Sequence, residues 1–79
     1  MTLSQALAKR IDMLLKEKGM SQYRLFKKSG VPQSTISSIR HMKNNSVSTL
    51  LIYQIAQGFD MSLREFFDSP LFSQENIQD

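Results

Sequence analysis

The sequence predicts an all-α protein, a compact bundle of about five short helices. Apolar residues recur every three or four positions along several segments, which is the period of an amphipathic helix. Ser and Thr precede these segments and Gly follows some of them, as is typical of helix ends. With 79 residues, 41 % of them hydrophobic, the chain can form one small core. We therefore expect residues 1–79 to be a single domain.

The first helix is expected from about residue 3 to residue 18. Its apolar stripe consists of side chains spaced four, four and three positions apart: Leu3, Leu7, Ile11 and Leu14. Thr2 and Gln5 have the spacing of a capping box, and Gly19 follows the last turn. Because Arg10 lies off the stripe, we expect its side chain to be solvated.

Two short helices are expected between residues 21 and 40, with a turn at residues 29–31. Ser21 can cap the first helix, and Gly30 can adopt the left-handed conformation that ends it. The inward face of the second helix is marked by two residues three positions apart, Ile36 and Ile39. Two helices joined by about three residues have the geometry of a helix-turn-helix.

A fourth helix is expected over residues 48–58, with Ile52, Ile55, Ala56 and Phe59 directed inward. A fifth is expected over residues 63–68, where Ser62 and Glu65 have capping-box spacing. The tail at residues 70–79 is apolar and then acidic, and it is expected to be flexible or to form a dimer contact. We favour burial within the chain for Phe67 and a dimer patch for Leu71 and Phe72.

The net charge of +3 is unevenly distributed. Residues 1–43 hold nine Lys and Arg against two acidic residues, a net of +7, and residues 44–79 hold one against five, a net of −4. A basic half that contains the helix-turn-helix is expected when one end of a domain faces phosphates. The alternative is a lysine-rich surface that is only solvated.

Several functional classes lack support in the sequence. The chain has no cysteine and one histidine, His41, so no metal site and no cofactor are expected. No carboxylate pair or nucleophile stands at a usable spacing, so we expect no enzyme, and nothing indicates a small-molecule ligand. No apolar run is long enough to span a membrane, and no signal peptide is visible, so a cytoplasmic location is expected.

The chain resembles the Cro/phage-repressor (XRE-type) helix-turn-helix family over roughly residues 8 to 67. The matching positions are Ser21, Gln22, Leu25, Gly30, the run from Ser34 to Ser37, Ile39, and the run from Ile55 to Phe67. The resemblance implies a lambda-repressor-like fold and sequence-specific binding of double-stranded DNA. It also implies a bacterial or phage transcription regulator, with repression as the first expectation and a homodimer left open.

The resemblance assigns roles to particular residues. Side chains at the start and outer face of the second helix of the motif would read base edges in the major groove: Gln33, Ser34, Thr35 and Ser38. Side chains on both sides of this helix would contact DNA phosphates: Ser21, Gln22, Arg24, Arg40, Lys43, Asn44 and Asn45.

The chain departs from the family pattern at four places. Phe26 stands where a small residue is usual, and Pro32 replaces the Ser that usually caps the recognition helix. Leu15 and Arg40 replace an Arg and a Glu that often pair, so Leu15 is expected in the core and Arg40 at the surface. The family's Gly near Met42 is also absent. Since a methionine disfavours the left-handed conformation, the turn there is expected at His41 or at residues 44–45.

These departures leave a second function open. The same fold could serve as a protein-interaction module, such as an antitoxin or an anti-repressor partner. The basic N-terminal half argues for DNA instead.

Overall fold

The computed structural model describes residues 1–43 and 46–79 and contains five α-helices followed by two short 3-10 helices. Their bounds are α1 Leu3–Glu17, α2 Gln22–Ser29, α3 Gln33–Arg40, α4 Thr49–Gly58, α5 Leu63–Phe67, η1 Pro70–Phe72 and η2 Gln74–Asn76. The described residues contain no strand, so the expected all-α class is confirmed. Each expected helix starts and ends within one residue of the observed one.

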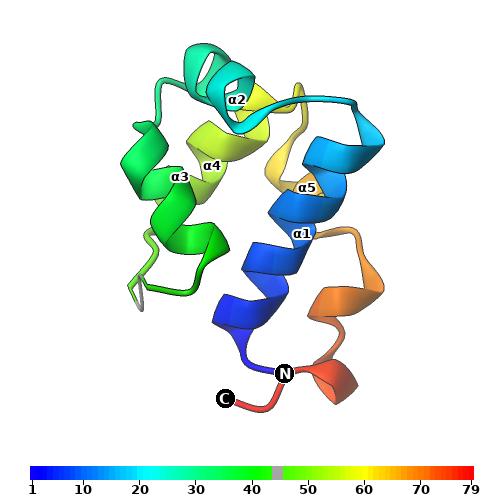
Figure 1. Ribbon diagram of the computed structural model, residues 1–79. Helices are drawn as coiled ribbons and strands as arrows, with labels where there is room; N and C mark the ends of the chain where they lie inside the picture. The colour runs from blue at the N-terminus through cyan, green and yellow to red at the C-terminus, as the bar shows by residue number, and fades with distance from the viewer. Residues whose placement is uncertain (44–45) are drawn as a thin grey trace.

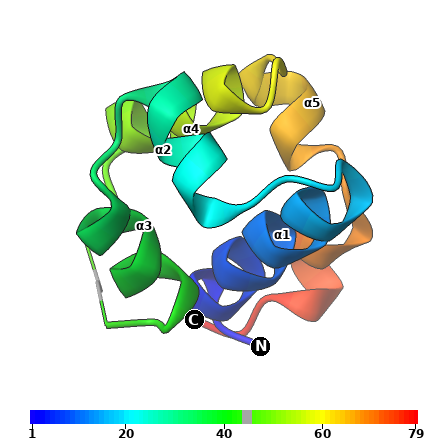
Figure 2. The same ribbon diagram turned by 45° about the horizontal axis from the view of Figure 1, so that its top comes forward.

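The helices enclose one core (Figures 1 and 2). Helix α2 packs on α4 and on α3, α1 packs on α3, and α5 packs on α4. Figure 1 shows α2 and α3 together at one side of the molecule, with the two chain termini at the opposite end from α2. The helix-turn-helix therefore lies on the surface, supported from behind by α1 and α4.

The core follows the predicted apolar stripes. The largest side chains with almost no exposed surface are Phe59, Phe66, Ile11, Leu25, Ile36, Ile39 and Ile55. Leu15 is 6 % exposed and packs in this core, as expected. Leu3 is an exception, because it begins the helix and is 44 % exposed.

The helix starts are capped as the sequence indicates. Thr2 and Ser62 each form a capping box, and the hydroxyls of Ser21 and Ser48 accept hydrogen bonds from backbone N–H groups of α2 and α4. Pro32 precedes α3 without a side-chain cap, as expected, and its carbonyl accepts from the N–H groups of the first turn. The pyrrolidine ring carries no hydrogen-bond acceptor, so α3 begins without a side-chain cap.

The prediction for Arg10 was wrong. Arg10 is only 8 % exposed, and its guanidinium lies on the Phe66 ring, 5.9 Å from the ring centre. It donates hydrogen bonds to the carbonyl oxygens of Phe66 at 2.7 Å and Glu65 at 2.9 Å. These carbonyls lie at the C-terminal end of α5, where the helix leaves acceptors short of donors, and the Glu65 carbonyl also accepts from the Asp68 N–H at 3.2 Å. A basic residue off the stripe therefore serves as the C-terminal cap of another helix.

The prediction for the turn after α3 was also wrong. Met42 itself adopts the left-handed conformation, with φ of 57°, while His41 has φ of −99°. The N–H groups of Met42 and Lys43 donate to the carbonyls of Ile39 and Ser38, which is the Schellman pattern of hydrogen bonds. Two backbone hydrogen bonds thus offset the strain of a non-glycine residue. The alternative turn at residues 44–45 lies outside the described residues.

Phe26 and Gly58 show how α2 is accommodated. Phe26 is half-buried against the core, and its ring meets the Tyr23 ring edge-on at 6.0 Å between centres. At Gly58 a Cβ atom would lie 2.8 Å from both Leu25 Cδ1 and Ser29 Cβ, so only glycine allows this approach of α4 to α2. The close approach of α4 to α2 is therefore made at Gly58, beside Leu25 and Ser29.

The C-terminal tail folds back along α1 and ends beside the N-terminus (Figure 1). The Met1 amino group donates to the Asn76 carbonyl at 2.9 Å, and the Gln78 N–H donates to the Met1 carbonyl at 2.8 Å. Phe72 packs on Phe66 and Phe67, whereas Phe67 is 40 % exposed. Phe72 is therefore partly buried within the chain, contrary to expectation, and Phe67 is more exposed than expected.

Candidate nucleic-acid interface

The outer face of α3 has the uncharged surface that the sequence predicts. Gln33 and Ser34 are exposed, and Thr35 and Ser38 are half-buried. Because Ile36 and Ile39 are anchored in the core, the orientation of α3 about its axis is fixed and these four polar residues remain on accessible surface. The structure therefore brings together the four residues expected to read bases, with Gln33 and Ser34 the most accessible.

The start of α2 lies beside the start of α3. Ser21 is exposed, and its hydroxyl accepts from the Arg24 N–H at 3.1 Å, so it is occupied as a cap. Gln22 is half-buried, and its side-chain Nε2 lies 3.4 Å from the Gln33 carbonyl oxygen. Of these two residues expected at phosphates, Gln22 therefore contacts the first turn of α3, and Ser21 precedes it as the cap of α2.

A chain of polar contacts links α1 to the start of α2. The Arg40 Nε donates to Asp12 Oδ1 at 2.6 Å, and the Arg40 Nη1 donates to Gln22 Oε1 at 2.9 Å. Arg40 is thus at the surface, as expected, but it is held by an acidic residue of α1. A shallow hollow opens beside the chain, lined by Asp12, Leu15, Lys16, Gly19, Met20, Ser21, Gln22 and Arg40.

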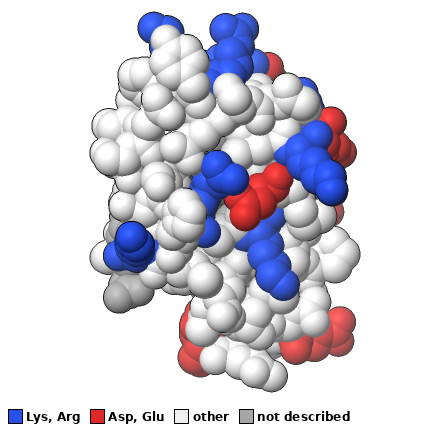
Figure 3. All heavy atoms as spheres, in the orientation of Figure 1, with Lys and Arg blue, Asp and Glu red and all other residues white. Residues whose placement is uncertain are grey.

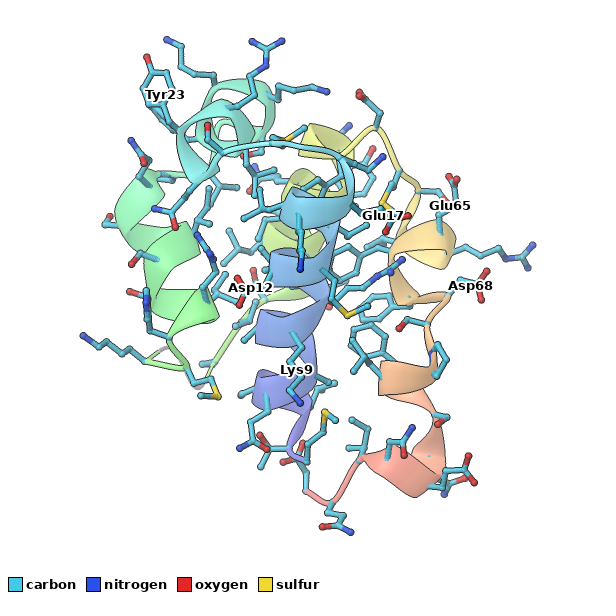
Figure 4. The ribbon with its side chains drawn as sticks, turned by 45° about the vertical axis from the view of Figure 1, so that its right-hand side comes forward. Lys9, Asp12, Glu17, Tyr23, Glu65 and Asp68 are labelled. Carbon is cyan, nitrogen blue, oxygen red and sulfur yellow. The ribbon has the colours of Figure 1, made fainter. Side chains whose placement is uncertain are left out.

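Sequence reasoning missed Asp12. Its only signal was that residues 1–43 contain just two acidic residues, Asp12 and Glu17. Figure 4 shows Asp12 on the side of α1 that faces α3, and Glu17 on the side nearer α5. Which of the two meets α3 depends on the angle at which the helices cross, and a sequence pattern does not give that angle.

Basic side chains gather over α2 and beside α3, while acidic side chains are prominent at the end of the molecule where the chain termini meet (Figure 3). Arg24 is exposed on α2. The Lys27 Nζ lies 5.9 Å from the centre of the Tyr23 ring, a ring that points outward from α2 (Figure 4). Lys28 is paired with Asp60 at 2.5 Å, which ties α2 to the turn after α4.

The ion pair of Lys28 shifts a pKa. The hydrogen bond from Lys28, and then its positive charge, lower the pKa of Asp60 below the ordinary range of an aspartate. Asp60 has a φ of 59°, so this side chain stands on a second strained, left-handed residue. Because Lys28 is paired with Asp60, the pair adds little positive field of its own and Lys28 is not a free ligand.

Lys43 is exposed just beyond α3, where the Schellman turn directs the chain away from the helix. The expected phosphate contacts of Asn44 and Asn45 lie outside the described residues. His41 is exposed, and its Nδ1 lies 2.8 Å from the Ser37 carbonyl. A hydrogen-bond acceptor at that distance requires the proton on Nδ1.

The described residues offer neither a metal cluster nor a membrane-spanning helix. Within residues 1–43 and 46–79, no group of three His, Cys, Asp or Glu side chains could hold a metal ion. No helix in this part of the chain is both long and apolar enough to cross a membrane. The polar path from Asp12 through Arg40 to Gln22 and the uncharged face of α3 lie next to each other on the surface formed by α1, α2 and α3.

Comparison with known proteins identifies the family and agrees with the fold. The family model for the Cro/C1-type helix-turn-helix DNA-binding domain matches residues 10–70. The crystal structure of the wild-type restriction-modification controller protein C.Esp1396I superposes with a TM-score of 0.75 at 29 % identity, over 82 % of this chain and 83 % of that chain. A tyrosine-to-phenylalanine mutant of the same protein gives a TM-score of 0.75 at 29 % identity, over 85 % and 86 %. None of the curated protein sequences matches the chain.

Proposed function

The chain belongs to the family of Cro/C1-type helix-turn-helix DNA-binding domains and is a DNA-binding regulator, and we propose that it recognises its operator with the outer face of α3. The observation that carries this proposal is the exposed, uncharged first turn of α3 between basic side chains. Gln33 offers a paired donor and acceptor that suit the N6 and N7 edge of adenine. Ser34, Thr35 and Ser38 offer hydroxyls for neighbouring bases.

Phosphate contacts would then orient α3 in the major groove. Gln22 and the Ser21 cap lie at the start of α2, where backbone N–H groups and a positive helix end attract an anion. Arg24 is exposed on α2, and Lys43 is exposed just beyond the end of α3. Such contacts set the position of the protein on the duplex, while the α3 side chains supply the sequence preference.

We further propose that two copies bind one operator. Support comes from apolar surface away from α3: Leu50 is 65 % exposed, Tyr53 43 % and Leu3 44 %. A hollow next to these residues is lined by Leu3, Leu7, Val47, Thr49, Ile52 and Phe67. A dimer of this kind would place two copies of α3 about 34 Å apart, one turn of DNA, on a palindromic site. Such a regulator would act as a repressor in the cytoplasm when its operator overlaps a promoter.

Selection from randomised duplexes tests sequence-specific binding. We expect a recovered motif with two related half-sites, and binding whose affinity falls with salt. If about four to six phosphates are neutralised per subunit, the slope of log K against log salt would be about −4 to −5. Recovery of no motif, together with absence of duplex binding at low salt, would contradict the proposal and favour a protein-interaction module.

A further inference from the structure

We propose that Asp12 and Arg40 are positioning residues, which orient the Gln22 side chain so that its amide NH₂ group faces a DNA phosphate. This inference rests on the proposed function. It also replaces the direct phosphate contact that the sequence led us to expect of Arg40. The observation behind it is the continuous path from Asp12 through Arg40 to Gln22 and the start of α3.

The chemistry of the Arg40–Gln22 contact fixes the orientation of the amide. A guanidinium has only donors, so the amide atom that faces it must be the oxygen. The contact is short, with 2.9 Å between Arg40 Nη1 and Gln22 Oε1. The NH₂ group must then point away from Arg40, and it lies 3.4 Å from the carbonyl oxygen of Gln33, at the first turn of α3.

This orientation is the one that an anion requires. Phosphate oxygens only accept hydrogen bonds, so a flipped amide would present its own oxygen to them and repel them. Without Arg40, the free Gln22 side chain would rotate among several conformations, and ordering it on DNA would cost conformational entropy. Arg40 removes most of that cost before binding, which is preorganisation.

Asp12 keeps Arg40 in place. Its carboxylate lies 2.6 Å from Arg40 Nε, whereas Gln22 is bound by Arg40 Nη1. Asp12 belongs to α1, which packs against α3. The Arg40 side chain is only 30 % exposed. Asp12 also neutralises the arginine, so the pair adds little positive field of its own. Asp12 would repel DNA phosphates by its charge, and its role here is to hold Arg40 in place.

Two readouts separate positioning from direct contact. A side chain that neutralises a phosphate releases a counterion, so its loss lowers the magnitude of the salt slope by about one. A side chain that acts through Gln22 leaves the slope unchanged. It also loses its effect when Gln22 is already truncated, because the two residues then form one coupled unit.

The first experiment is a double-mutant cycle on the selected operator, with Arg40→Met, Gln22→Ala and the double variant. Thermal unfolding of each variant confirms that it is folded. We expect Arg40→Met to weaken binding by about threefold to tenfold, the size of one hydrogen bond, with an unchanged salt slope. In the Gln22→Ala background we expect Arg40→Met to change binding less than about twofold. Independent effects with a slope reduced by about one would overturn the inference.

Glu17 supplies a matched control for Asp12, since both are carboxylates of α1 in the basic half of the chain. If only charge mattered, Asp12→Ala and Glu17→Ala would both strengthen binding. We expect Glu17→Ala to leave affinity unchanged or slightly higher, Asp12→Ala to lower it, and Asp12→Asn to restore most of it, because an amide oxygen can still accept from Arg40. Tighter binding by Asp12→Ala than by Glu17→Ala would refute the role of Asp12. Failure of the wild-type chain to bind any duplex would instead refute the proposed function itself.

Discussion

The Nε of Arg10 donates a hydrogen bond to the carbonyl oxygen of Phe66, with 2.7 Å between the two atoms. The contact spans the core from the middle of α1 to the end of α5, and a second bond to the Glu65 carbonyl at 2.9 Å accompanies it. The aliphatic part of Arg10 is buried while its charge faces the negative end of the α5 dipole. An apparently ordinary surface cation thus holds the last α-helix on the first.

Replacing Arg10 with Met should therefore destabilise the fold. The variant keeps most of the buried apolar stem. It removes the Arg10 donor from the Phe66 carbonyl and leaves the Glu65 carbonyl with only the Asp68 N–H, so we expect the free energy of unfolding to fall by about 2 to 3 kcal/mol. Urea unfolding followed by circular dichroism measures it. Lys9→Met is the control, since Lys9 is exposed on the same helix. Equal stability of the two variants would show that the Arg10 hydrogen bonds add nothing.

At Met42, a glycine should be more stabilising than an alanine. Its left-handed backbone, with φ of 57°, is costly for a residue with a Cβ atom. We expect Met42→Gly to raise the free energy of unfolding by about 0.5 to 1 kcal/mol relative to Met42→Ala, which removes the same side chain but keeps the strain. A calorimetric comparison of the two melting temperatures decides. Lower stability for the glycine variant would mean that flexibility in the unfolded chain outweighs the relief of strain.

Leu15 and Arg40 should differ strongly in their effect on stability. Leu15 is buried, so Leu15→Ala should lower the free energy of unfolding by about 2 to 4 kcal/mol through loss of packing. Arg40 and Asp12 are both partly exposed, so Arg40→Ala should cost less than about 1 kcal/mol. Chemical denaturation of both variants tests this. A strongly destabilised Arg40→Ala would show that the path from Asp12 to Gln22 is structural, which would also remove its value as a probe of DNA binding.

Acid should weaken the link between α2 and the turn after α4. The pKa of Asp60 is lowered by the hydrogen bond and the charge of Lys28, so the folded state favours the carboxylate more than the unfolded state does. The resulting stabilisation is present above the ordinary aspartate pKa and is lost as the pH falls through the lower, folded-state pKa. The free energy of unfolding of the wild type, measured relative to that of Asp60→Asn, should therefore decline on acidification. Lys28→Met removes the cause of the pKa shift, so this variant should not show that decline. Parallel acid profiles for wild type and Asp60→Asn would contradict this assignment.

Much of the fold could be predicted because it rests on local signals. Capping residues such as Thr2 and Ser62, and the stripe through Ile11, act within one helix and are visible in one stretch of sequence. The prediction for Arg10 failed at a contact between helices, whereas the prediction for the turn at Met42 failed within a single turn. Arg10 is polar and off the stripe, yet it is buried because α5 ends beside it. Gly58 is required by a close approach of α4 to α2 that only the assembled helices create.

In the candidate site, too, local features could be predicted from the sequence and contacts between helices could not. The polar face of α3 could be predicted from periodicity, because Ile36 and Ile39 fix which side faces outward. The partner of Arg40 could not, since any acidic residue in the first half of the chain was compatible with the pattern. Asp12 was selected by the crossing of α1 and α3, which is a property of the packed core.

The most direct test of base reading by α3 is the change in sequence preference caused by Gln33→Ala, measured on the selected operator and all its single-base variants. Lys43→Ala is the matched control, because Lys43 is exposed just beyond the helix, where phosphates rather than bases would be near. We predict that Gln33→Ala loses about 1 to 3 kcal/mol of discrimination at one base position in each half-site and keeps it elsewhere. Lys43→Ala should weaken every duplex alike and reduce the salt slope by about one. If Gln33→Ala instead weakened all duplexes equally, the amide would contact a phosphate, and α3 would not read DNA in the way proposed.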